Sequence, residues 1–139
     1  MLIAACLVVA STVAATIPGE FFTLRRAHST IGKTVPEEDY RVAGDALVLM
    51  NSRIASSGSD ASPLPGARLK DGIWHRRENR RLDRLTLTRA RSTGDYVWCN
   101  HSGCRALAHW LGAPAGAQIV EVRAGAACER LARPPAKAP

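Results

Sequence analysis

The sequence predicts an all-β protein, a small antiparallel sandwich or open barrel preceded by an apolar N-terminal helix. Three observations support this prediction. Apolar and polar residues alternate with period two after residue 20, a Gly-Asp pair separates two apolar runs, and short strand-like runs recur between turn residues. With 139 residues, the chain is long enough for one domain with one modest core.

The first eighteen residues contain no charged side chain, and Val13-Ala14-Ala15 is typical of a signal-peptide cleavage site. We therefore expect residues 1–18 to act as a signal peptide or as a membrane anchor, because roughly 17 to 25 apolar residues can span a bilayer. Residues 19–131 would form the β-rich domain. Residues 132–139 contain three prolines and little apolar content, which predicts a disordered tail.

The central part of the chain predicts a β-hairpin. Residues 38–43 and 46–54 flank Gly44-Asp45, and a two-residue connection with glycine first is typical of a type II′ turn. The Ser-, Gly- and Pro-rich stretch 55–66 predicts a surface loop. Further short strands are expected at residues 20–28, 71–75, 83–89, 94–99 and 117–123.

The chain is basic. Nineteen Lys and Arg residues against twelve Asp and Glu residues give a formal net charge of +7, which favours anionic partners. We expect no nucleic-acid partner, because no Gly-aromatic binding strip or Cys2His2 spacing occurs. The cluster at residues 75–84 predicts either a solvated loop or a patch that contacts anionic lipid through four arginines: Arg76, Arg77, Arg80 and Arg81.

Cysteine usage agrees with export. Cys99 and Cys104 lie close together and predict a short-loop disulfide in an oxidising periplasm, with two reduced thiols as the alternative. With Cys6 assigned to the leader, Cys128 would remain a free thiol. Cys99, Cys104 and the neighbouring histidines lack the usual spacing of a zinc site, so we expect neither a metal nor a cofactor.

Four stretches occur in a recognisable order: "FTLRRAHS", "EEDYRVAGDALVLMNSRI", "PLPGARLKDGIWH" and "GDYVWCNHSGCRAL". From about residue 20 to 112, they resemble the domain of unknown function 1850 family of small exported or membrane-anchored bacterial proteins. The family's loop usually reads Gly-x-Gly-Ala-Gly-Met, whereas residues 56–61 retain only Gly58.

Members of that family are often encoded beside the membrane components of TAXI-type tripartite ATP-independent periplasmic (TRAP) transporters. The resemblance therefore implies an accessory role in solute uptake. The implied partner is the membrane subunit or the solute-binding protein of such a transporter. We accordingly expect a non-enzymatic protein that is periplasmic, secreted or tethered to the inner membrane.

The candidate site lies on either side of the stretch between His28 and Glu37. Binding of an anionic or polar solute or of a partner protein is one interpretation, and it uses His28, Ser29, Glu37, Glu38, Arg41 and Gly58. The alternative is a structural His-Glu pair that fixes the strand register. An envelope protein in contact with lipid is a further alternative.

A hydrolase or metal site using His28 with Glu37 or Glu38 has weaker support. Alternate side chains on a strand face opposite sides, so at most one of the two glutamates can readily meet His28. Ser29 faces away from His28 for the same reason, which argues against a nucleophile pair. A phosphate loop at Gly32-Lys33-Thr34 lacks both the preceding glycine and the following helix.

Overall fold

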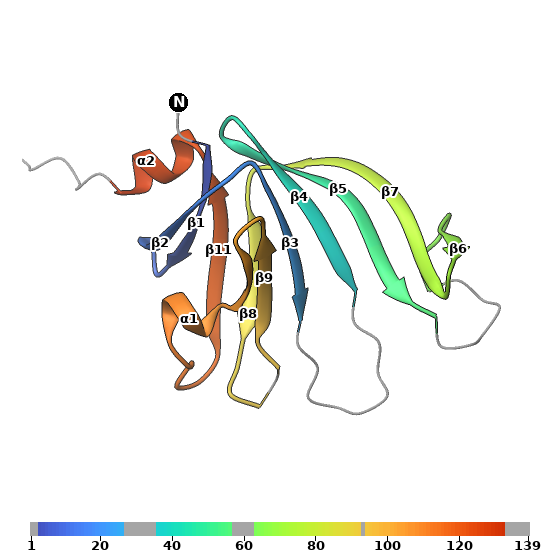
Figure 1. Ribbon diagram of the computed structural model, residues 1–139. Coiled ribbons are helices and arrows are strands. Elements are labelled where there is room, and N and C mark those ends of the chain that lie inside the picture. Colours follow the sequence, from blue (N-terminus) through green and yellow to red (C-terminus); the bar gives the residue numbers. More distant parts are fainter. Residues whose placement is uncertain (1–2, 27–35, 57–62, 93, 133–139) are drawn as a thin grey trace, which may run out of the picture.

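The computed structural model describes residues 3–26, 36–56, 63–92 and 94–132. These residues form two antiparallel β-sheets and two short helices (Figure 1), which confirms the predicted all-β class. In chain order, the elements are β1 (Ala4–Val9), β2 (Thr12–Pro18), β3 (Phe21–Arg26), β4 (Glu37–Ala43), β5 (Ala46–Ala55), β6 (Arg68–Lys70), β7 (Ile73–Leu82), β8 (Leu85–Arg89), β9 (Tyr96–Asn100), β10 (Gly103–Ala106), α1 (Ala108–Leu111), β11 (Gln118–Ala124) and α2 (Ala126–Ala132).

The larger sheet has the strand order β10-β9-β3-β4-β5-β7-β6. Its centre contains the predicted hairpin, in which Ala43 of β4 pairs with Ala46 of β5 across Gly44-Asp45. Gly44 has a φ of +67°, the left-handed backbone that a type II′ turn requires at its first central residue. The register that follows from this turn decides which side chains share each face of the sheet.

The smaller sheet, with the order β2-β1-β11-β8, shows that the predicted N-terminal helix was wrong. Residues 4–18 form β1 and β2, and the side chains from Ala4 to Val8 are at most 3% exposed. A short apolar run fits a buried strand as well as a helix. The turn between the strands has positive φ at both Ala10 and Ser11, and no glycine indicates it in the sequence.

The core lies between the two sheets. From the larger sheet, Phe22 stacks on Tyr40 and on Trp98, with ring centroids 5.2 Å and 3.9 Å apart. From the smaller sheet, Leu7 and Val120 are completely buried in the same cluster. Each side chain of this size contributes about 1.5–3 kcal/mol when it is removed from water, so the N-terminal strands belong to the same folded unit as the rest.

A buried ion pair joins the smaller sheet to the start of β9 and to α1. Arg89 is 1% exposed, and its Nε and a terminal nitrogen donate to the two oxygens of Asp95 at 2.9 Å and 3.2 Å. Arg89 also donates to Gln118 Oε1 and to the Gly112 carbonyl. Burial alone raises the pKa of Asp95, but hydrogen bonds from Arg89 and from the Ala108 backbone outweigh it and hold that pKa below 3.8.

Two disulfides connect the cysteines. The predicted bond between Cys99 and Cys104 is present and joins facing residues of β9 and β10. The expectation of a free thiol at Cys128 was wrong, because Cys128 of α2 bonds to Cys6 of β1. That expectation followed from placing Cys6 in a leader separate from the domain. The Cys6–Cys128 bond fixes α2 against the outer side of the smaller sheet, where Val8 packs.

Most of the arginine-rich stretch at residues 75–84 lies in a strand. A solvated loop was one of the two interpretations of that stretch. Residues 73–82 form β7, paired with β5 along its length. Charged side chains on both faces conceal the alternation that normally indicates a strand, and Trp74 is the buried residue that reveals it. The predicted disordered tail falls at residues 133–139, outside the described residues, and its first position, Ala132, ends α2.

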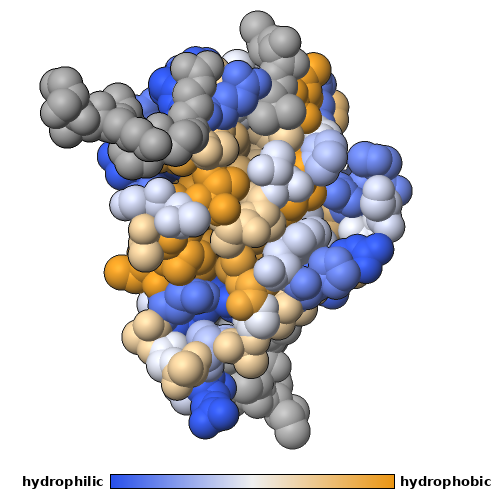
Figure 2. Space-filling model, turned by 90° about the vertical axis from the view of Figure 1, so that its left-hand side faces the viewer, coloured by the Kyte–Doolittle hydropathy of each residue, from blue (hydrophilic) through white to orange (hydrophobic). Residues whose placement is uncertain are grey.

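The side on which β2 and the helices lie has an apolar centre. Figure 2 shows apolar side chains gathered in the middle of this side with polar groups around them. β2 is an edge strand of the smaller sheet. Within the described part of the chain, neither helix has the length and apolar character needed to cross a bilayer.

Candidate functional site

A row of arginine, glutamate and histidine residues crosses the outer face of the larger sheet. Directly opposed residues of paired strands share a face, and the pairing aligns five of them across β3, β4, β5, β7 and β6: Arg25, Glu37, Arg53, His75 and Arg68. Leu24, the neighbour of Arg25, points into the core. Because successive side chains alternate, the row points away from the core.

Arg53 is fixed in place by two carboxylates. One of its terminal nitrogens donates to Glu37 Oε2 at 3.1 Å and to Asp39 Oδ1 at 3.0 Å, and the other bonds to Asp39 Oδ2. Thr23 donates its hydroxyl to Asp39 at 2.6 Å. Burial raises the pKa of Asp39, but the bonds from Arg53 and Thr23 outweigh it and hold that pKa below 3.8. Arg53 therefore has a preorganised position.

A groove beside this network is rich in cations. We call it the basic groove, and its lining residues are Asn51, Arg53, Gly66, Arg68, His75, Arg76 and Arg77. Arg53 and Arg76 are engaged with carboxylates. Among the described residues, no carboxylate forms an ion pair with Arg68 or Arg77. Two guanidinium groups in the basic groove are therefore available to an anionic partner.

The inner face of the same sheet end holds a second polar cluster. Buried Ser52 donates to Glu78 Oε2 at 2.8 Å, and Arg76 Nε donates to the same oxygen at 2.7 Å. Burial raises the pKa of Glu78, but these two bonds outweigh it and lower that pKa from its ordinary value. On this face, burial and the nearby Glu38 carboxylate raise the pKa of Tyr40.

The two adjacent glutamates lie on opposite faces, as the strand geometry predicted. Glu37 is opposite Arg25 and Arg53, whereas Glu38 is opposite Leu24 and Ser52. They therefore cannot act together on one ligand. The other predicted site residues, His28, Ser29 and Gly58, lie outside the described residues.

Arg41 lies on the outer face, opposite Phe21 of β3 and Val48 of β5. It shares that face with Glu37 and Asp39 but lies nearer the Gly44-Asp45 turn, away from the basic groove.

The four arginines of the predicted lipid patch do not share one face. Arg76 and Arg80 pair with Ser52 and Leu49, which point inward. Arg77 and Arg81 pair with Asn51 and Val48 on the outer face. Alternate side chains along β7 share a face, so the two members of each pair, four residues apart, lie on the same side of the sheet.

Sequence reasoning did not single out Arg53, His75 or Arg68. Each lies at an alternate position of a strand, but their alignment depends on the register of β5 with β7 as well as on the short β6–β7 hairpin. The chain contains sixteen arginines (nineteen basic residues, three of them Lys), so position alone could not distinguish these from ordinary solvated side chains. The His-Arg-Arg sequence at residues 75–77 was the available signal.

The fold and its disulfides define a small all-β domain with a cationic sheet face. The chain belongs to the DUF1850 family, a domain of unknown function whose family model matches residues 22–107, more than half of the chain. The resemblance inferred from the sequence motifs is therefore confirmed. The matched segment runs from β3 past β10 and includes the basic groove. No curated protein and no solved structure matches the chain significantly.

Proposed function

We propose that this protein is a non-enzymatic periplasmic accessory protein that assists a TAXI-type TRAP transporter by binding an acidic surface of a transporter subunit. The observation on which this rests is the alignment of Arg53, His75 and Arg68 across three strands beside Arg77. The two disulfides support an oxidising compartment such as the periplasm.

A protein partner suits the basic groove better than a small solute does. Solute sites enclose most of the surface of their ligand, whereas the row lies on the open face of a sheet. Arg53 is held by Glu37 and Asp39, so little side-chain entropy is lost when a partner binds beside it. Charges at such a surface mainly accelerate association and select the partner, and salt weakens both effects.

Catalysis has less support. Glu37 accepts a hydrogen bond from Arg53 at 3.1 Å, so it would have to leave that bond to act as a base or as a metal ligand. If a hydrolase or metal site used His28, replacing His28 with alanine would abolish the enzymatic activity of the protein.

The test compares two double variants in membranes of the native bacterium. R68E/R77E reverses two charges of the basic groove, and R84E/R91E reverses two exposed arginines elsewhere. Crosslinking followed by purification should recover a transporter subunit with the wild type and with R84E/R91E, and at least tenfold less with R68E/R77E. Recovery of no transporter component, or equal losses with both variants, would contradict the proposal, as would unchanged solute uptake after deletion of the protein.

Contact with anionic lipid remains the second candidate, because Arg77 and Arg81 share the outer face. Each arginine near a charged bilayer contributes about 1 kcal/mol. Flotation with phosphatidylglycerol vesicles should then be sensitive to salt and should be lost in R77Q/R81Q. The variant R76Q/R80Q is the matched control, because its two changes are on the inner face. Equal flotation of both variants would contradict lipid contact through this face.

A further inference from the structure

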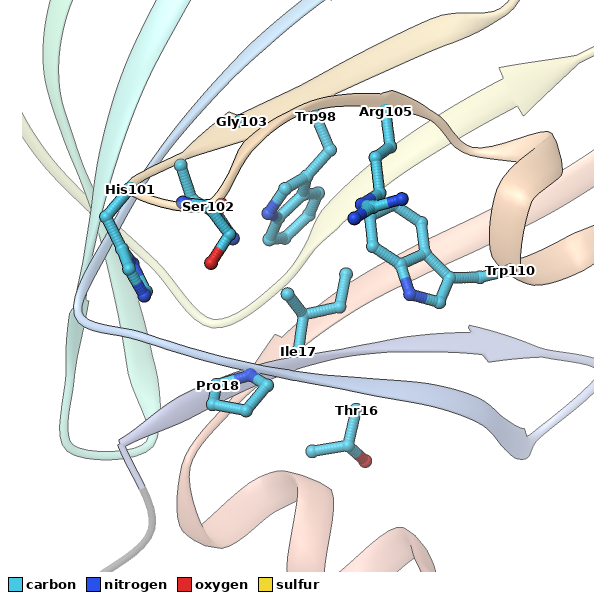
Figure 3. A pocket seen from close by; sticks show the side chains of 10 residues that line it. Thr16, Ile17, Pro18, Trp98, His101, Ser102, Gly103, Arg105 and Trp110 are labelled. Carbon is cyan, nitrogen blue, oxygen red and sulfur yellow. Dashed lines mark hydrogen bonds between the residues drawn. The ribbon is translucent and has the colours of Figure 1, made fainter.

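A cavity of about 220 Å³ lies between the end of β2, the β9–β10 hairpin and α1 (Figure 3). It is larger than an engineered cavity of about 150 Å³ that takes up benzene. Its walls include the indole rings of Trp98 and Trp110, whose centroids are 6.3 Å apart, and the side chain of Ile17. The space therefore suits a small organic molecule with an apolar body.

One wall of this cavity contains a buried hydrogen-bond donor without a partner. Trp98 is 2% exposed, and its Nε1 is buried with no acceptor within hydrogen-bond distance. Figure 3 shows this nitrogen on the side of the ring that faces His101 and Ser102. A buried donor left unpaired destabilises the protein, and an acceptor in the cavity would remove that penalty.

The lining residues of the cavity include a cation and no carboxylate. Arg105 of β10 is directly opposite Trp98 of β9, so both side chains lie on the same face of the hairpin. The next pair along, Cys99 with Cys104, is the disulfide that fixes this hairpin. Arg105 and Trp110 both line the cavity and are labelled in Figure 3. Donors and positive charge thus surround an apolar space.

We propose that this cavity binds a small organic carboxylate. One carboxylate oxygen accepts the Trp98 Nε1–H, next to the polar groups of His101 and Ser102. The apolar body packs against Ile17 and Trp110, and Arg105 supplies the compensating positive charge. Hydrogen bonds to a charged acceptor are stronger than those to a neutral one, so the anion is preferred over a neutral analogue of the same shape. This site does not depend on the basic groove.

The test uses benzoate, and its neutral isostere benzamide, with the ¹⁵N-labelled full-length chain. Its three tryptophans give three indole N–H signals. We expect benzoate to move the Trp98 signal while the Trp74 signal on β7 stays in place, and to bind at least tenfold more tightly than benzamide. W98F, which keeps the stacking on Phe22, should weaken binding about tenfold, equivalent to one hydrogen bond to a charged group.

A second pair of variants keeps the test decisive if W98F does not fold. R105Q removes an exposed cation of the cavity and should weaken benzoate binding several-fold. The control R84Q, which lies outside the cavity, should leave it unchanged, as should R68E/R77E. An unmoved Trp98 signal at millimolar benzoate, equal binding of benzoate and benzamide, or equal effects of R105Q and R84Q would overturn the proposal.

Discussion

Arg89 shows how one buried charge organises its surroundings. Its guanidinium makes four hydrogen bonds, two to the Asp95 carboxylate and two to Gln118 and Gly112. A buried ion pair gives stability only when its polar atoms are satisfied in this way. The pair fixes the start of β9, which also carries Trp98 and the disulfide-bonded Cys99.

We expect Arg89→Met to lower the free energy of unfolding by about 3–5 kcal/mol, because the Asp95 carboxylate would be left without its charged partner. Urea denaturation followed by tryptophan fluorescence measures this loss. The control is Arg84→Met, which removes an exposed ion pair with Glu121 and should cost at most about 1 kcal/mol. Losses of similar size in the two variants would mean that the buried pair has no special role.

Among the elements, β1 differs most from the expectation based on the sequence, which was a leader or an anchor helix. It lies between β2 and β11, and its Cys6 bonds to Cys128 of α2. Cleavage at the predicted signal-peptide site, Val13-Ala14-Ala15, would remove β1 and most of β2 together with Cys6. Cleavage and this fold are therefore exclusive, and the intact mass of the protein purified from its native cells distinguishes them.

The two disulfides should differ in their effect on stability. The bond between Cys6 and Cys128 closes a loop with a sequence separation of 122, and the bond between Cys99 and Cys104 one of 5. Chain entropy then assigns about 5 kcal/mol to the first and about 2 kcal/mol to the second. Urea denaturation without reductant should show this order in the paired Cys→Ser variants. An equal or reversed order would indicate that Cys6 is not bonded in the native protein.

At the scale of the whole molecule, three carboxyl groups link stability to pH. The pKa values of Asp39, Glu78 and Asp95 are lower in the folded protein than their ordinary values of 3.8 to 4.5. A group with a lowered pKa stabilises the fold above its unfolded pKa and loses that contribution as the pH falls through its folded pKa. Acid should therefore destabilise the protein.

We expect the free energy of unfolding to stay nearly constant from pH 7 to about 5 and to decrease below about pH 4. Urea denaturation at a series of pH values gives this profile. Asp39→Asn should have a shallower acid slope than the wild type, because it removes one of the three titrating groups. A wild-type profile that is flat down to pH 3 would contradict the ion-pair arrangement.

Much of the larger sheet could be predicted from sequence, because its signals are local. The Gly44-Asp45 turn, the alternation on either side of it and the close pair Cys99 and Cys104 need only a few neighbouring residues. The candidate site was predicted less well. Glu37 and Glu38 were placed on the correct opposite faces, but Arg53 and His75 are brought into one row by the pairing of β5 with β7, and Arg68 joins that row through the β6–β7 hairpin.

The sequence by itself determined the all-β class, the central hairpin and the family of the chain, because each depends on local pattern or on ordered motifs. It favoured the Cys99–Cys104 disulfide over two reduced thiols, and the structure contains that bond. Only the tertiary structure decided that the apolar N-terminal segment forms strands, that Cys6 meets Cys128 and that Trp98 faces a cavity with Arg105. The physical reason is that an apolar run lowers its free energy equally well in a helix or in a buried strand. Its partners, β11 and α2, lie more than a hundred residues away and settle the choice.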